Sequence, residues 1–273
     1  MIDTDARNDI RQVVFRGALL AALGVVALGS VVPQPLAAQV ARAQAAAARP
    51  QPRFTRIFGS DSMEISMAAV SPDSRWIVFS GRQGSDTLTL WVVPASGGAP
   101  IQLTSGRHSD NGPRWFPSGD RIAFVSDRPS APGEMQTYVM TIPFDARTGQ
   151  TTGPAQQVSL EPVFDAGGVS PDGRWIAFFA LGEVAGTGRL VVVPSAGGTA
   201  RTVVQVDGFN YTREWSPDGR EIYFSAGLRG AAGRALMRVS ADSGQAQPLW
   251  STPRRVIALN TTLRQVLITP ATK

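Results

Sequence analysis

The chain has 273 residues, a net charge of +5, no Cys and a single His. These counts exclude disulfides, Cys-ligated zinc, iron–sulfur clusters, thiol nucleophiles and a metal site built on several histidines. Hydrophobic residues make up 43% of the sequence and charged residues 17%, which is typical of a globular protein. A chain of this length holds one or two domains with a sizeable core.

The N-terminal region has the layout of a secretory signal peptide. Arg11 and Arg16 precede an apolar run over residues 17–32, and small residues follow it. We expect cleavage after Ala38, or alternatively within Ala43–Ala45, which would place the protein in the bacterial periplasm or outside the cell. A retained anchor is the main alternative, but the apolar run has 16 residues where a bilayer span needs about 20. The prediction is an exported protein with no stable membrane insertion after cleavage.

A repeated motif dominates the rest of the chain. Residues 71–79, 116–124, 170–178 and 216–224 each hold a Pro-containing turn sequence followed by alternating apolar residues. Counted from its Pro, each copy has Ile at the fifth following position and Phe at the seventh, and successive prolines are 45, 54 and 46 residues apart. Self-similarity at such a period indicates a repeat architecture.

Each copy is expected to form a tight turn between two strands. Pro fixes the first corner, Asp or Ser supports the turn through local hydrogen bonds, and Gly takes the left-handed position. Ile and Phe two residues apart share one face of the following strand, so that face is expected to be buried. Trp115 and Trp215 stand two residues before the Pro in two of the copies. A third strand is predicted at residues 87–93, 136–142, 189–193 and 235–239, and a fourth short strand at positions such as 101–104 and 202–204.

Four short strands in a unit of about 45 residues are the signature of a propeller blade. The predicted fold class is all-β, a β-propeller of four clear four-stranded blades plus a partial fifth, preceded by a signal peptide. Residues 256–260 and 265–269 would supply the first two strands of the fifth blade, and Phe54–Phe58 is expected to join them and close the ring. An open arc, whose exposed edges would favour self-association, is the alternative. The predicted domains are a signal peptide at 1–38, a flexible linker at 39–52 and the propeller at 53–273.

The repeat resembles that of a known family. Ser-Pro-Asp-Gly, a basic residue, Ile, a small residue and Phe, followed by a Val-Val-Pro strand and Gly-Gly, is similar to the TolB-like family of WD40-like (PD40) β-propellers. The resemblance covers about residues 53–269 and implies an exported propeller. The family includes periplasmic TolB, which works with an outer-membrane lipoprotein, and propeller domains of prolyl-oligopeptidase-type and tricorn-like serine peptidases. The sequence shows no counterpart of TolB's separate α/β domain or of the peptidases' hydrolase domain.

No catalytic or cofactor motif accompanies the repeat. A serine hydrolase of this type needs a Gly-x-Ser-x-Gly motif and a His, but Gly168–Asp172 lacks the final Gly and belongs to a predicted turn. His108, the single histidine, lies in a predicted loop between blades, and Asp73, Asp172 and Asp218 are explained by their turns. Gly motifs that bind phosphate or dinucleotides are missing from the sequence. We therefore expect no enzyme activity, no metal and no cofactor.

The loops that enter the first strand of each blade are the predicted binding surface, because loops carry sites on a rigid scaffold. Carboxylates and aromatic side chains there would suit a basic or aromatic segment of a partner, although turn capping by the same Asp residues is an open alternative. The candidate binding residues are Asp61, Glu64, His108, Asp110, Phe164, Asp165, Asp207, Phe209, Tyr211 and Arg213.

The function predicted from these features is an exported, non-catalytic propeller that binds a protein or peptide partner in the cell envelope. A detached or truncated substrate-gating propeller of a serine peptidase is one alternative, and a propeller that processes a small molecule or carbohydrate through rim carboxylates is another. Nucleic acid is not an expected partner, since the basic residues are dispersed Arg, with Lys273 the single Lys, and no nucleic-acid-binding module is present in the sequence.

Overall fold

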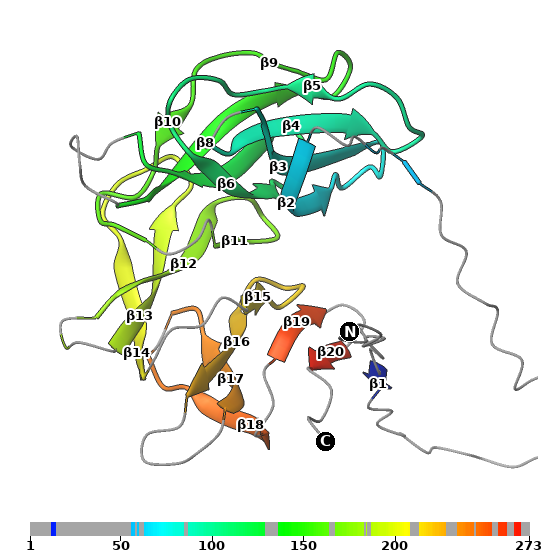
Figure 1. Ribbon diagram of the computed structural model, residues 1–273. Coiled ribbons are helices and arrows are strands. Elements are labelled where there is room, and N and C mark those ends of the chain that lie inside the picture. Colours follow the sequence, from blue (N-terminus) through cyan, green and yellow to red (C-terminus); the bar gives the residue numbers. More distant parts are fainter. Residues whose placement is uncertain are drawn as a thin grey trace, which may run out of the picture. The chain divides into compact units, whose positions relative to one another are not determined.

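The fold is given by a computed structural model of the chain. The described residues are 12–14, 56–57, 59, 63–84, 87–128, 136–163, 167–182, 184, 187–207, 213–227, 234–242, 244–252, 256–260 and 265–268. Within these ranges the chain is all-β, with twenty strands and no helix (Figure 1). The predicted fold class is confirmed.

The four sequence repeats form four antiparallel blades. Each blade has four strands in sequential order, and the short strand β9 (Gln150–Thr151) adds to the outer part of the second. A single backbone pair, Asp207 with Gly227, joins the third blade to the fourth. Blade 1 comprises β2 (Met63–Val70), β3 (Trp76–Gln83), β4 (Thr89–Pro94) and β5 (Ile101–Gln102), and blade 2 comprises β6 (Asp110–Trp115), β7 (Arg121–Ser126), β8 (Tyr138–Asp145) and β10 (Gln156–Gln157). Blade 3 comprises β11 (Gly168–Val169), β12 (Trp175–Leu181), β13 (Thr187–Pro194) and β14 (Arg201–Asp207). Blade 4 comprises β15 (Arg213–Trp215), β16 (Glu221–Gly227), β17 (Arg234–Ser240) and β18 (Gln247–Thr252).

The repeated turn between the first two strands of each blade is fixed by its own hydrogen bonds. In blade 3, the backbone N–H of Ser170 donates to the carbonyl of Trp175 at 2.8 Å, and the N–H of Gly173 donates to the carbonyl of Ser170 at 2.8 Å. The Ser170 hydroxyl donates to Asp172 Oδ1 at 2.6 Å and accepts from the Trp175 N–H at 3.0 Å. Gly173 has a φ of 72°, as the predicted left-handed position requires. The same position in blade 1 is held by Ser74, at a φ of 59°.

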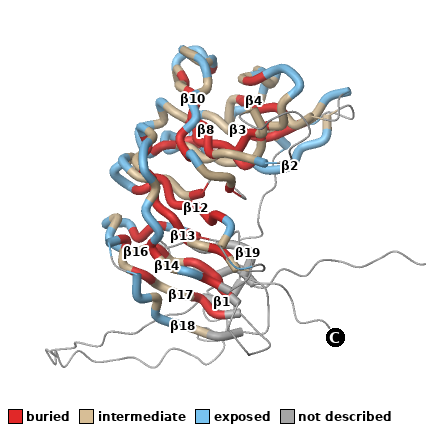
Figure 2. The backbone as a smooth tube through the Cα atoms, turned by 90° about the vertical axis from the view of Figure 1, so that its left-hand side faces the viewer, coloured by how far each residue is buried: buried red, intermediate tan, exposed pale blue. Residues whose placement is uncertain are grey.

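A hydrophobic core lies between each pair of consecutive blades. In β7, Ile122 and Phe124 pack against blade 1, whereas Ala123 and Val125 pack against blade 3, because successive side chains of a strand point to opposite faces. The repeated Ile and Phe of blades 3 and 4 face the preceding blade in the same way. Figure 2 shows the buried stretches along middle strands such as β12 and β13. The predicted burial of the Ile–Phe face is confirmed in blades 2, 3 and 4, whereas in blade 1 Phe79 is buried and Ile77 is half-buried. Each fully buried Phe contributes about 1.5–3 kcal/mol.

The first strands of successive blades lie against one another: β2 against β6, and β11 against both β6 and β15. Two indoles tie these strands together. Trp115 Nε1 of β6 donates to the carbonyl of Ala69 in β2 at 3.0 Å, and Trp215 Nε1 of β15 donates to the carbonyl of Gly168 in β11 at 2.9 Å. The Trp that precedes the turn therefore anchors its blade to the preceding one.

The two C-terminal strands agree with the prediction, and a third strand from the N-terminal end of the chain pairs with them. β19 (Val256–Asn260) and β20 (Gln265–Ile268) form the expected hairpin. The free edge of β20 pairs with β1 (Gln12–Val14), in the order β1–β20–β19. The predicted closing strand Phe54–Phe58 lies mostly outside the described residues, so its pairing stays a prediction.

The signal peptide and the linker fall almost entirely outside the described residues and stay predictions. Among the residues that the structure describes, no helix is long and apolar enough to cross a membrane. The strand β1 lies within the segment predicted as the signal peptide.

Candidate binding sites

Asp110, a predicted rim residue at the start of β6, is completely buried. Its Oδ2 accepts a hydrogen bond from Arg128 Nη2 at 2.7 Å, and its backbone N–H donates to the carbonyl of Leu88 in blade 1 at 2.8 Å. Within the described ranges, Asp110 Oδ1 and Arg128 Nη1 have no hydrogen-bond partner. The pair joins the entry of blade 2 to the residue just beyond β7.

His108 and Glu64 each contact a charged side chain. His108 Nδ1 is 3.2 Å from Asp127 Oδ1, which also accepts the backbone N–H of Ser109 at 3.0 Å. Glu64 is exposed on β2, with its Oε2 3.3 Å from Arg82 Nε on β3. His108 and Asp110 are thus held by the consecutive residues Asp127 and Arg128, which brings these two candidates together at one end of blade 2.

Arg213 is the buried first residue of β15, between blades 3 and 4. Its Nε donates to the carbonyl of Ala177 in β12 at 3.1 Å, and its guanidinium carbon lies 5.3 Å from the centre of the Phe179 ring. This geometry gives Arg213 a role in joining two blades, through a charge-assisted hydrogen bond and a cation–π contact.

The remaining predicted rim residues cannot be placed as side chains. Asp61, Phe164, Asp165, Phe209 and Tyr211 lie outside the described residues, and Asp207 is described only as the last backbone position of β14. The rim as a binding surface stays a prediction. In the described part of the chain, no group of three or more His, Asp or Glu side chains could hold a metal ion.

The turn carboxylates are held in the ionised form. The hydrogen bond from the Ser170 hydroxyl, followed by those from the backbone and guanidinium of Arg174, lowers the pKa of Asp172 to about 2. The equivalent hydrogen bonds from Ser71 and Arg75 lower the pKa of Asp73 to about 2. Ser170, the Ser of the incomplete nucleophile motif, is almost completely buried and its hydroxyl is committed to this turn.

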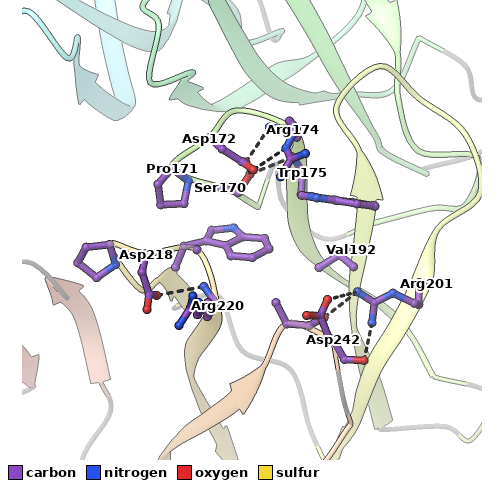
Figure 3. A pocket seen from close by; sticks show the side chains of 14 residues that line it. Ser170, Pro171, Asp172, Arg174, Trp175, Val192, Arg201, Asp218, Arg220 and Asp242 are labelled. Atoms are coloured by element: carbon purple, nitrogen blue, oxygen red, sulfur yellow. Dashed lines mark hydrogen bonds and ion pairs between the residues drawn. The ribbon is translucent and has the colours of Figure 1, made fainter.

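A pocket lies between blades 3 and 4, beside their repeated turns (Figure 3). Its volume is about 470 Å³, within the range of ligand sites, which runs from about 300 to 1,000 Å³. The lining combines two indoles, three Arg and three Asp. The lining residues are Ser170, Pro171, Asp172, Arg174, Trp175, Val192, Arg201, Trp215, Pro217, Asp218, Gly219, Arg220, Ala241 and Asp242.

The cations of the pocket are oriented by neighbouring oxygens. Arg174 Nε donates to Asp172 Oδ2 at 2.7 Å, on the blade 3 side of the pocket. Arg201 Nη2 donates to the Ala241 carbonyl at 2.7 Å and lies 3.9 Å from Asp242 Oδ1. In Figure 3, Asp172, Arg174 and Trp175 lie across the pocket from Arg201 and Asp242. The pocket therefore offers aromatic surface with charged groups of both signs around it.

Sequence reasoning missed this pocket, although the sequence holds a signal for it. Trp175 and Trp215 were visible as parts of two repeat copies, and each is expected in a propeller core. The informative position is Ala241, a small residue where the copy in blade 2 has Phe144. A comparison of the copies beyond the turn motif would have found it.

The architecture and the pocket define a repeat β-propeller with an inter-blade cavity. No known protein-family profile matches the chain. Its fold is similar to that of a protein assigned as TolB from Agrobacterium tumefaciens, with a TM-score of 0.55 and 17% identity over 75% of this chain and 74% of that one. TolB from Acinetobacter baumannii has a TM-score of 0.53 and 16% identity over 76% of this chain and 46% of that one. At these identities the likeness establishes the β-propeller fold that the TolB structures have.

Two further comparisons cover smaller parts of the matched proteins. A puromycin-hydrolysing peptidase from Mycobacterium tuberculosis has a TM-score of 0.51 and 14% identity over 72% of this chain and 32% of that one. The uncharacterised protein YidR of Escherichia coli K12 is 28% identical over 115 residues, which are 42% of this chain and 25% of YidR. The matched region thus spans about a quarter of YidR.

Proposed function

We propose that the chain is an exported, non-catalytic β-propeller that binds a protein or peptide partner in the cell envelope. The observation that carries this proposal is the pocket of about 470 Å³ between blades 3 and 4, built on a rigid scaffold and lined by Trp175, Trp215 and Arg201. Aromatic and Arg side chains are the residue types that dominate the energetics of protein–protein interfaces.

The non-catalytic part of the proposal is supported by the state of the two groups a serine hydrolase would use. The Ser170 hydroxyl bonds to Asp172 and Trp175 within a tight turn, so it is not presented to a substrate. His108 lies 3.2 Å from Asp127, in another blade from Ser170. Neither residue has the geometry of a nucleophile–base pair.

The envelope location rests on the sequence and on the resemblance to TolB-like propellers. The basic and apolar N-terminal segment predicts export, and TolB, the family's periplasmic member, works with an outer-membrane lipoprotein.

Partner capture tests the proposal. The purified chain is immobilised and exposed to increasing amounts of envelope extract, with heat-unfolded chain as the control. The expected result is a partner that is retained saturably by the folded chain and not by the unfolded one. Folded chain that retains no saturable partner would contradict the proposal.

A second candidate is a substrate-gating propeller of a serine peptidase. The likeness to the puromycin-hydrolysing peptidase favours it, and this chain spans about a third of that protein. The discriminating observation is the neighbouring coding sequence. A downstream frame that encodes an α/β-hydrolase, whose peptidase activity changes when the chain is added, would favour this candidate over the first.

A further inference from the structure

The interface between blades 1 and 2 shows how the chain fills the space that is open between blades 3 and 4. Phe144, at the end of β8, lies between two indoles, with ring-centre distances of 5.8 Å to Trp76 and 4.9 Å to Trp115. Both contacts are edge-to-face, with interplanar angles of 83° and 76°. Ile101 of β5 packs against the same cluster. The result is a closed aromatic core at this interface.

The interface between blades 3 and 4 has both indoles but lacks counterparts of the Phe144 and Ile101 side chains. Trp175 and Trp215 occupy the same repeat positions as Trp76 and Trp115, four residues after and two residues before the turn Pro. Ala241 replaces Phe144: its N–H donates to the Arg220 carbonyl, as that of Phe144 does to the Asp120 carbonyl. Likewise Arg201 replaces Ile101, since Arg201 pairs with Val192 as Ile101 pairs with Val92. The pocket is therefore the space that a Phe ring fills in the other interface.

Two hydrogen-bond donors beside the pocket have no acceptor carbonyl among the described residues, and position 243, which corresponds to Ala146, lies outside those residues. At the filled interface, Trp76 Nε1 and Arg75 Nη2 both donate to the carbonyl of Ala146, at 2.9 and 3.3 Å. Ala146 follows Phe144 by two residues, so ring and carbonyl belong to one short peptide segment. Trp175 and Arg174 repeat the two donors, and among the described residues no carbonyl accepts from either side chain. A partner that brings both an aromatic ring and a backbone carbonyl would satisfy the whole site.

We propose that this pocket binds an aromatic side chain of a peptide segment, with the ring in the place that Phe144 takes between blades 1 and 2. The ring would pack edge-to-face on the indoles, a geometry that aromatic pairs prefer and that this chain already uses. A backbone carbonyl two residues further along the segment accepts from Trp175 Nε1 and from the Arg174 guanidinium. The inference rests on the proposed partner-binding function and names the chemistry of the partner.

A peptide series tests the proposal with the full chain. The peptides are acetyl-Gly-Gly-X-Gly-Gly-Gly-amide with X as Phe, Tyr, Leu or Ala, and binding is followed by the indole N–H signals in NMR. Assignment of the indoles uses single Trp→Phe variants. We expect the Phe and Tyr peptides to bind at least about tenfold more tightly than the Ala peptide, since ring burial supplies the difference. The Trp175 and Trp215 signals should shift and that of Trp76 should not.

A filled variant provides the control. Arg201→Ile combined with Ala241→Phe rebuilds the blade 1–2 interface, so it should lose the preference for aromatic peptides and keep or raise the melting temperature. If this variant does not fold, Ala241→Leu takes its place. Leu160→Ala, at an exposed position just after blade 2, should bind like the natural chain. Equal affinity for all four peptides, shifts confined to other indoles, or undiminished binding by the filled variant would overturn the proposal.

The outcomes separate this inference from the proposed function. An envelope partner retained equally by the natural chain and by the filled variant would leave partner binding standing and refute the aromatic pocket. Binding of the Phe peptide at Trp175 without any envelope partner would support the pocket and contradict the proposed function.

Discussion

Removal of the Phe144 ring should open between blades 1 and 2 the same cavity that exists between blades 3 and 4. Phe144 is 4% exposed and makes edge-to-face contacts with Trp76 and Trp115. Phe→Ala substitutions in cores cost about 3–5 kcal/mol, because the lost transfer free energy adds to the cost of the cavity. We expect Phe144→Ala to fall in this range, a large fraction of the total stability of about 5–15 kcal/mol that is usual for a folded domain.

Thermal unfolding followed by circular dichroism measures this effect. For a domain of this size, about 1 kcal/mol changes the melting temperature by about 2–4 °C, so Phe144→Ala should lower it by about 6–20 °C. Leu160→Ala is the matched control, because its side chain is 74% exposed and such changes stay within about 0.5 kcal/mol. A Phe144→Ala melting temperature within 2 °C of the control would refute the argument that this ring fills a cavity between the blades.

Three further substitutions test other parts of the structure. Ser74→Gly should raise the free energy of unfolding by about 0.5–1 kcal/mol in urea denaturation, because Ser74 has a φ of 59°, where a side chain is strained. Gly173→Ser should lower the free energy of unfolding for the same reason, and changes of the opposite sign would contradict the argument. Asp172 has its pKa lowered to about 2, so it stabilises the fold above its unfolded pKa of about 3.9, and this contribution is lost as the pH falls towards 2. Between pH 5 and pH 2, the melting temperature of Asp172→Asn should therefore fall less than that of the natural chain. An unchanged pH dependence would count against the stabilising role of the hydrogen bonds to Asp172. Arg213→Met should lower the free energy of unfolding by about 1–3 kcal/mol in urea denaturation, because it removes the Arg213 donor from the Ala177 carbonyl. Arg220→Met, at an exposed position, should change the free energy of unfolding by no more than about 0.5 kcal/mol.

The blades were predictable because their sequence signals are local and repeated. The turn needs only Pro, Asp and Gly in fixed order, and the Ile–Phe face follows from the two-residue period of a strand. Four copies of the same pattern reinforce one another, so the strands that begin at Trp76, Arg121 and Trp175 lie where the pattern predicts them.

The pocket and the third strand of the C-terminal sheet were not predictable in the same way. The pocket depends on a pair of residues far apart in sequence, Arg201 and Ala241, which matter because of what stands at the equivalent positions of another interface. The pairing of Gln12–Val14 with β20 joins segments from opposite ends of the chain, and no local sequence pattern indicates it. Arg213 was read as a rim residue because a strand boundary does not reveal which side chain turns inward.

Site-specific photo-crosslinking in the producing cell tests whether a partner is held at the open interface between blades 3 and 4. A diazirine amino acid replaces Asp242, which is 97% exposed at the pocket, and in a second variant replaces Asp145, the equivalent residue at the filled interface. We expect a discrete cross-linked adduct from position 242 that disappears when Ala241→Phe fills the pocket, and none from position 145. Equal adducts from both positions, or an adduct at 242 that persists in the filled pocket, would contradict it.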